Sequence, residues 1–233
     1  TDELLTMQAE MLKRFAGLMG DMELTHEHHR LGALQGKLLD ADGSSVLYDY
    51  FSEFGIAEPD VISFELDQAG ADVRGICNAI TRSMARSSRG AFTSSTSVHA
   101  LAGDDFYDKL TTHPNVEKFY LNWSAANDLK KGNAFQAFTF GGITFHNYRG
   151  TDDGSTIAIP TAEAKLFPVG ARECFKHVMA PYEGFNDINE LGDPFYARTI
   201  LDEKREQWVK GELYSYPLFI CQRPNVLRNA TLT

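Results

Sequence analysis

The sequence predicts an α+β fold, and three observations lead to this prediction. Apolar residues recur at three- and four-residue steps along the start of the chain, which is the pattern of one face of a long α-helix. Two turns, Asp42-Gly43 and Gly141-Gly142, separate short apolar runs in the manner of β-hairpins. Helical and strand-like segments do not alternate as regular βα units, which favours α+β over a doubly wound fold.

The opening helix is expected to run from the first residues to Leu34, over roughly 50 Å at about 1.5 Å per residue. Thr1 is a candidate N-cap, and Asp2 and Glu3 suit the positive end of the helix dipole. Glycines inside the pattern mark possible bends. The apolar face consists of Leu4, Met7, Met11, Phe15, Leu18 and Met22, and the glycines are Gly17, Gly20 and Gly32.

The first hairpin follows this helix, with Asp42-Gly43 as a tight turn whose central residues take positive φ. A second helix begins after an Asp72 N-cap, because Val73, Ile76, Cys77, Ile80 and Met84 share one face. The opposite face carries Arg74, Arg82 and Arg86, with Arg89 just beyond its end. These arginines form either a solvated face or a contact with a neighbouring subunit or a phosphate.

The remaining elements are read from local alternation and turn residues. A Ser/Thr/Gly-rich stretch, 87–97, is expected to be a mobile loop or a boundary. Gly103-Asp104 opens a helix with Phe106, Tyr107 and Leu110 on its apolar face. Strands are expected at 61–66, 98–101, 157–159, 172–179, 208–215 and 218–221, a second hairpin at 135–140 and 143–148, and an exposed turn at 151–155.

Composition limits the class of protein. The chain has 233 residues, with 32 acidic side chains against 22 lysines and arginines, for a formal charge of −10. A dedicated nucleic-acid binder needs a concentrated basic face, so this balance argues against one. The three cysteines, Cys77, Cys174 and Cys221, show no C-x-x-C spacing and are expected to be small buried hydrophobes. No run of eighteen apolar residues exists, so no membrane span is expected.

Two motifs suggest chemistry. His26-Glu27-His28-His29 resembles a zinc-protease helix, but that pattern needs a second histidine four residues after the first, where Arg30 stands. A solvated polar face is therefore expected. Leu38 to Ser44 resembles the first motif of haloacid-dehalogenase phosphatases, with Asp40 as nucleophile and Asp42 as acid/base.

The phosphatase alternative has a second motif, because Gly103-Asp104 with Asp108 matches the magnesium motif of that superfamily. Against it, only Leu38 and Leu39 precede Asp40, whereas a central parallel strand is a longer apolar run. The hairpin also explains Asp42-Gly43 directly.

Several short stretches, taken in order, resemble the major capsid protein E family of lambda-like tailed bacteriophages. They cover essentially the whole chain, and their collinear order carries the resemblance. The stretches are Thr25–Arg30, Gly32–Gly36, Leu39–Gly43, Phe51–Gly55, Gly141–Ile143, Tyr148–Gly150, Ala162–Ala164, Phe167-Pro168, Gly170, Ser215–Leu218 and Arg223-Pro224.

The resemblance implies the tailed-phage major capsid protein fold, with a long spine helix in a peripheral domain and an inserted axial domain. On this pattern, residues 1–71 and 166–233 form the peripheral domain and residues 72–165 the axial domain. The implied function is that of a structural subunit of a phage or prophage icosahedral head shell that encloses packaged double-stranded DNA. An enzymatic role, a cofactor and catalytic or metal-binding residues are not expected.

The implied partners are copies of the chain itself, arranged as pentamers and hexamers, with head decoration and scaffold proteins as further candidates. DNA would be contacted only indirectly, and no membrane is involved. The implied location is the virion capsid, with assembly in the host bacterial cytoplasm. A cellular nanocompartment shell with the same fold is a third possibility that the sequence alone does not separate.

Subunits of this family carry an N-terminal arm and an extended loop before the spine helix, and both are expected to be missing from this sequence. Because such parts reach across to neighbouring subunits, the 233-residue chain by itself is expected to be a soluble monomer or small oligomer.

Overall fold

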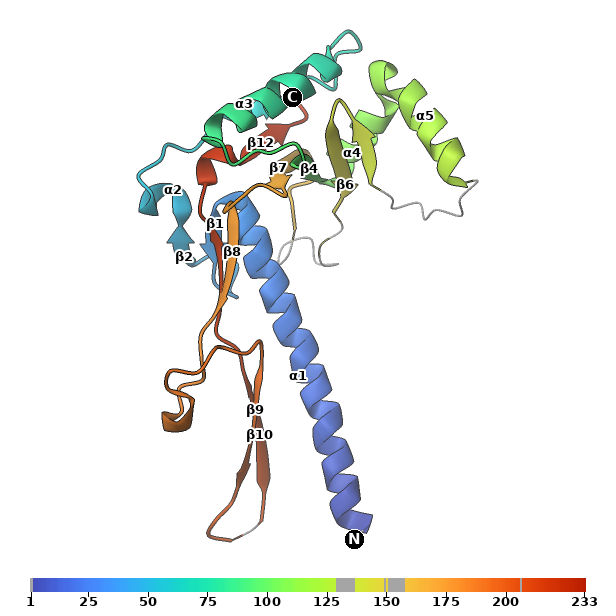
Figure 1. The fold of residues 1–233 in the computed structure, drawn as a ribbon. Helices are drawn as coiled ribbons and strands as arrows, with labels where there is room; N and C mark the ends of the chain where they lie inside the picture. Colours follow the sequence, from blue (N-terminus) through green and yellow to red (C-terminus); the bar gives the residue numbers. More distant parts are fainter. Residues whose placement is uncertain (1, 129–136, 149, 151–157, 206) are drawn as a thin grey trace. The chain divides into compact units, whose positions relative to one another are not determined.

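The computed structural model describes residues 2–128, 137–148, 150, 158–205 and 207–233 (Figure 1). The chain forms two compact units. The first unit comprises residues 1–30 and 176–220, and the second comprises residues 31–175 and 221–233.

Helix α1 (Asp2–Gln35) is continuous over 34 residues, which confirms the predicted opening helix. It passes through the three glycines without interruption, and no other atom lies near the place of a side chain at Gly17 or Gly20. The N-cap predicted at Thr1 lies outside the described residues. The predicted apolar face is only partly covered, since Met7 and Leu18 are each 42% exposed.

The first unit otherwise consists of paired strands. Strands β9 and β10 form a two-stranded antiparallel ribbon, and β8 pairs with β11. Sequence analysis missed β9, whereas β8, β10 and β11 confirm the strands predicted near these positions. Strand β11 begins at Pro217, because the first residue of a strand tolerates a missing N–H. The bounds are β8 (Phe175–Met179), η1 (Phe185–Asp187), β9 (Tyr196–Leu201), β10 (Val209–Tyr214) and β11 (Pro217–Cys221).

The second unit is built on a six-stranded mixed sheet in the order β3-β12-β7-β4-β6-β5. The pairs β3/β12 and β4/β6 are parallel and the other pairs are antiparallel. Helices and a largely antiparallel sheet together confirm the α+β class. The strands are β3 (Ile62–Ser63), β4 (Ser97–Ala102), β5 (Phe138–Phe140), β6 (Ile143–Asn147), β7 (Glu163–Val169) and β12 (Arg228–Thr231), and η2 (Pro224–Val226) precedes the last of them.

Helix α3 (Val73–Ser87) confirms the helix predicted after Asp72. The Asp72 carboxylate accepts a hydrogen bond from the Gly75 N–H at 2.9 Å, which satisfies a free donor of the first turn. Val73, Cys77, Ile80 and Met84 are at most 1% exposed, so the predicted apolar face is the buried one. Helix α4 (Asp104–Thr112) confirms the next predicted helix, and α5 (Pro114–Asp128) follows it.

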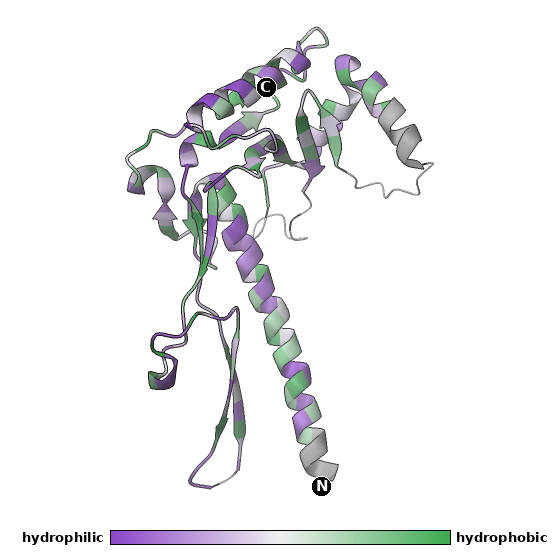
Figure 2. Cartoon of the chain, in the orientation of Figure 1, coloured by the Kyte–Doolittle hydropathy of each residue, from purple (hydrophilic) through white to green (hydrophobic). Residues whose placement is uncertain are grey.

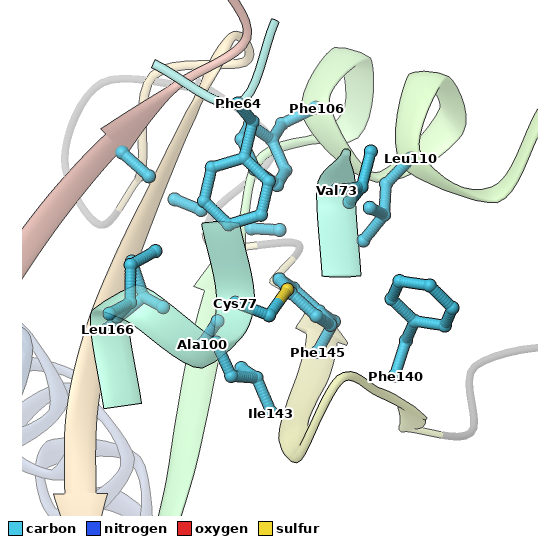
Figure 3. Close-up of a cluster of buried hydrophobic side chains, with 14 of the residues drawn as sticks. Phe64, Val73, Cys77, Ala100, Phe106, Leu110, Phe140, Ile143, Phe145 and Leu166 are labelled. Atoms are coloured by element: carbon cyan, nitrogen blue, oxygen red, sulfur yellow. The ribbon is translucent and has the colours of Figure 1, made fainter. Parts of the chain in front are cut away.

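The hydrophobic core of the second unit lies between these helices and the sheet (Figure 3). Phe64, Phe106 and Phe145 meet edge to face or stacked, with ring centroids 5.2 to 6.5 Å apart. Such aromatic pairs contribute beyond the area they bury. Cys77 and the other two cysteines are free and buried, as predicted.

Both predicted hairpins exist, but their turns differ. Gly141 and Gly142 have φ of 59° and 82°, which suits a two-residue turn between β5 and β6. In the β1–β2 hairpin only Gly43 has positive φ, so the predicted tight turn at Asp42-Gly43 is wrong. The Asp42 carboxylate instead accepts hydrogen bonds from the N–H groups of Ser44 and Ser45 and shapes a longer loop. The bounds are β1 (Lys37–Leu39), β2 (Val46–Asp49) and α2 (Tyr50–Glu53).

Other predicted segments end differently. Strand β3 is shorter than the predicted 61–66, because Glu65 takes a positive φ of 51°. Ala158 and Ile159 are not in a strand. Residues 135–136, the predicted turn at 151–155 and Ile157 lie outside the described residues.

The predicted boundaries between the peripheral and axial domains stay a prediction. The segment 72–165 lies wholly within the second unit. Its predicted end falls inside β7, and the sheet also contains β3 and β12 from outside the segment.

Candidate assembly surfaces

The histidine motif of α1 is not the solvated polar face that was predicted. His26 is only 4% exposed, and its Nε2 lies 2.9 Å from the Ser215 hydroxyl. Its ring stacks on Phe195 at 5.3 Å and meets Phe219 edge-on. Burial, followed by the nearby Arg30 charge, lowers the pKa of His26. A neutral, packed imidazole therefore ties α1 to the strands of its own unit.

Asp40 does not occupy the position that phosphatase chemistry needs. It is the first residue of the loop that joins β1 to the antiparallel strand β2, so it does not lie at the end of a parallel strand. The Asp42 carboxylate is engaged with Ser44 and Ser45, and these hydrogen bonds hold its pKa below the usual range.

The second phosphatase motif is a helix surface. Asp104 and Asp108 lie on the exposed side of α4. Across the described part of the chain, no three histidine, cysteine or carboxylate side chains are arranged to hold a metal ion. The arrangement thus lacks the strand-end nucleophile of the predicted phosphatase.

The arginine face of α3 is defined by Arg74, Arg82 and Arg86, with Arg89 two residues after the helix. All four side chains are exposed, and none forms an ion pair with a described residue. The exposed arginine face predicted from the sequence is therefore confirmed. Whether it is only solvated or contacts a partner stays open at this point.

A loop of the first unit, residues 184–193, carries strongly exposed apolar side chains. Phe185 is 95% exposed, Leu191 93% and Ile188 60%. Large apolar side chains that gather on one loop mark protein contact sites. Sequence analysis did not single out this apolar loop, although the Phe-x-x-Ile-x-x-Leu spacing of Phe185, Ile188 and Leu191 was an available signal.

Polar contacts tie this loop to the β9–β10 ribbon. The Arg198 guanidinium lies 4.3 Å above the Tyr182 ring and donates to the Asp187 carboxylate at 2.8 Å. Tyr182 also contacts the ring of Tyr196 at 5.7 Å and that of Tyr214 at 5.3 Å. The loop is thereby held through Asp187 and through Tyr182 just before it, while its apolar side chains remain exposed.

A groove of about 920 Å³ lies between the early part of α1 and β10 within the first unit. Met7, Met11, Phe15 and Leu18 line one side and Trp208 the other. Trp208 is 53% exposed. Figure 2 shows apolar and polar residues interspersed along α1, so this helix does not bury a complete apolar stripe.

The apolar loop and the groove both present large apolar side chains, which is a feature of the buried centre of protein–protein contacts. In the described residues no helix has the length and hydropathy to cross a membrane.

Comparison with known proteins identifies the family. The family model of phage major capsid protein E matches residues 1–232. The chain is 25% identical to the major capsid protein of Salmonella phage Felix O1, over 97% of this chain and 69% of that protein. It is 26% identical to the major capsid protein of Pseudomonas phage KPP10, over 88% of this chain and 63% of that protein. The chain thus spans about two thirds of the length of these relatives.

The family model covers nearly every residue of both compact units, α1 and the six-stranded sheet included. Both relatives are named major capsid proteins of phages, and the resemblance to the capsid family seen in the short collinear stretches is confirmed. The chain belongs to the phage major capsid protein E family.

Proposed function

We propose that this chain is a structural subunit of a phage or prophage icosahedral head shell that encloses double-stranded DNA. The observation that carries the proposal is the family match over residues 1–232. The exposed apolar loop and the groove of the first unit support a subunit that completes its burial by contact with other copies. The role is structural rather than catalytic.

The proposed architecture is the tailed-phage capsid fold. Helix α1 acts as the spine helix of a peripheral domain, formed mainly by residues 1–71 and 166–233. The axial domain is centred on residues 72–165, and we assign β3 and β12 to it as well, because they pair within its sheet. Axial domains meet around the centres of pentamers and hexamers.

The proposed partners are those that a head-shell subunit would contact. Copies of the chain are the main partner, head decoration and scaffold proteins bind its surface, and packaged DNA is enclosed without specific recognition. The formal charge of −10 supports this last point, because duplex affinity grows with the number of phosphates that are neutralised. Assembly takes place in the host cytoplasm and the product is the virion capsid.

The test is the composition of phage particles from a host that encodes the chain. DNA-filled particles, purified from an induced lysate, should contain this chain as their most abundant protein, as quantified by mass spectrometry. DNA-filled particles built from another shell protein and lacking this chain would refute the proposal. Shells that contain the chain but never DNA would favour a nanocompartment.

A parallel assay tests the structural role. The purified chain and an Asp40→Asn variant should be equally inactive on a generic phosphate ester with magnesium. Phosphatase activity of the wild type that disappears in Asp40→Asn would contradict the structural role and would favour Asp40 as a nucleophile.

A further inference from the structure

A stretch of the chain with a positive charge stands apart from its acidic remainder. Residues 73–103 contain four arginines and no acidic residue or lysine, so all 32 acidic side chains lie elsewhere. The four arginines form the arginine face of α3, which is exposed along its length. On the helix, Arg74, Arg82 and Arg86 fall within roughly a third of the circumference at about 100° per residue. The three helical arginines therefore lie along one side of α3.

A complementary surface follows immediately in the sequence. Asp104, Asp105 and Asp108 are exposed on α4 and define its acidic face. None of the three forms an ion pair with a described residue, and the only basic side chain of that helix, Lys109, is paired with Asp67. Both surfaces thus hold charges that the subunit itself leaves uncompensated.

The two helices cover the same side of the sheet at opposite ends of its strands. Both contribute to one core, α3 through Cys77 and α4 through Phe106 (Figure 3). A Cβ on Gly141, in the β5–β6 turn, would lie 2.6 Å from that of Cys77, so α3 covers this end. At the other end, the Gly103 N–H binds the Glu163 carbonyl at 2.9 Å just before α4 begins.

Helix dipoles explain only part of this charge. Arg86 and Arg89 lie at the negative end of α3, and Asp104 and Asp105 at the positive end of α4, where such charges are favourable. Arg74 stands in the first turn of α3, where a cation is unfavourable. The helix dipole therefore accounts for Arg86 and Arg89 but not for Arg74 or Arg82.

We propose that the arginine face of α3 in one subunit binds the acidic face of α4 in a second copy of this chain. The inference rests on the proposed function, because it names a contact by which the shell subunit joins its neighbours. Complementary patches at different places on one subunit make a heterologous contact, which repeats head to tail and closes into a ring when the rotation allows.

A second copy fits the arginine face better than duplex DNA does. A subunit with a formal charge of −10 repels a polyanion over most of its surface, whereas another copy presents acidic faces. Guanidinium groups pair with carboxylates in a planar, two-bond geometry, so four arginines set orientation as well as attraction.

Charge-swap variants of the full chain test the contact. One variant carries Arg82→Glu with Arg86→Glu, the other Asp105→Lys with Asp108→Lys, and Lys204→Glu with Arg205→Glu is the control for net charge. Sedimentation equilibrium at low salt measures self-association up to about 1 mM. Each swap should weaken association at least about tenfold relative to wild type, and the control should change it less than about threefold.

Mixing gives the decisive result. The two swapped variants are complementary to each other at both faces, so an equimolar mixture should associate within about threefold of wild type and lose this in high salt. A mixture no better than either variant alone overturns the inference, as does a wild-type chain that shows no association over the whole range.

Two further arms remove ambiguity. If a reversed variant does not fold by circular dichroism, Arg82→Gln with Arg86→Gln replaces it, with a smaller loss expected. If the arginine variant loses binding to a short DNA duplex while self-association is unchanged, the face binds nucleic acid and the inference is wrong. If phage particles contain the chain but the charge swaps do not change its self-association, this contact is refuted while the proposed function stays intact.

Discussion

Arg228 is a buried cation whose four hydrogen-bond partners are all neutral. Its guanidinium donates to the hydroxyls of Ser83 and Ser87 at 2.9 Å and to the carbonyls of Asn225 and Leu227 at 2.7 Å. These bonds join β12 to the last turns of α3. Burial lowers the pKa of Arg228, so the hydrogen bonds compensate the desolvation that would otherwise disfavour the charge.

Replacement of Arg228 should destabilise the second unit. Arg228→Met leaves two carbonyls and two hydroxyls without their donor, and we expect it to reduce the free energy of unfolding by about 2–4 kcal/mol. Urea denaturation measures the change. Arg82→Met, on the exposed side of α3, is the control and should alter the free energy of unfolding by less than about 0.5 kcal/mol. Equal effects of the two changes would show that the Arg228 network contributes little.

His99 and His146 make the stability of the sheet depend on pH. His99 Nδ1 lies 2.9 Å from His146 Nε2, and the rings stack at 5.2 Å. Burial lowers the pKa of both, and the neighbouring His99 lowers that of His146 further. Since the folded pKa lies below the unfolded value of 6.5, the unfolded state binds more protons as the pH falls. Stability is therefore present above pH 6.5 and is lost as the pH falls through that value.

The pH prediction is tested by denaturation at several pH values. In the wild type, the urea concentration at the unfolding midpoint should decrease as the pH is lowered from about 7.5 to about 5.5. In His146→Gln this decrease should be smaller. A slope that persists in His146→Gln would assign the pH dependence to other groups.

At the scale of elements, the β5–β6 turn offers a matched pair of glycines. Both have positive φ, so alanine at either position costs the strain of a left-handed backbone, about 1 kcal/mol. A Cβ on Gly141 would also lie 2.6 Å from the Cβ of buried Cys77, whereas nothing lies within 4 Å of one on Gly142. Gly141→Ala should therefore destabilise the chain by about 1–3 kcal/mol more than Gly142→Ala in thermal unfolding. Similar melting temperatures for the two variants would mean that α3 can move away from the turn without cost.

Elements that carry their own local signal could be predicted from sequence. Helix α3 has both a capping aspartate and a strict apolar period, and the glycine pair fixes the β5–β6 hairpin. Strand β7 was missed because it contains Lys165 and Pro168, which read as non-strand residues. Lys165 is nevertheless 8% exposed, since Glu163 pairs with it at 2.7 Å and the sheet surrounds it. Its environment comes from β4 and β12, which are distant in sequence.

The same distinction applies to the candidate surfaces. The arginine face could be predicted, because the apolar period of α3 identifies its buried side and the arginines occupy the opposite side. The packing of His26 against Phe195 and Ser215 could not, because those partners lie about 170–190 residues away along the chain and no local pattern announces them. Helix α5 was overlooked although Pro114 stands at its first position, a common helix start.

At the scale of the whole molecule, buried apolar residues are distributed unequally between the two units. The main core cluster lies entirely in the second unit. Among the described residues of the first unit, Phe219 is the only buried hydrophobic side chain. The first unit is held instead by strand pairing, by the His26 contacts and by Arg198. A unit of this kind gains much of its stability from burial against partners.

Hydrogen exchange followed by mass spectrometry should reveal this inequality. Local opening free energy follows buried apolar contact, so amides of β9, β10 and residues 7–30 of α1 should exchange at least about a hundredfold faster than those of β4, β6 and β7 in the unassembled chain. The strands of the core sheet serve as the internal standard, because they belong to the same molecule under the same conditions. If neighbouring copies cover the groove and the apolar loop in assembled shells, as proposed, the protection of α1 and the β9–β10 ribbon should rise toward that of the sheet. Equal protection of α1 and β4 before assembly would show that the first unit is already stable alone, and that its exposed apolar residues are not kept for contact.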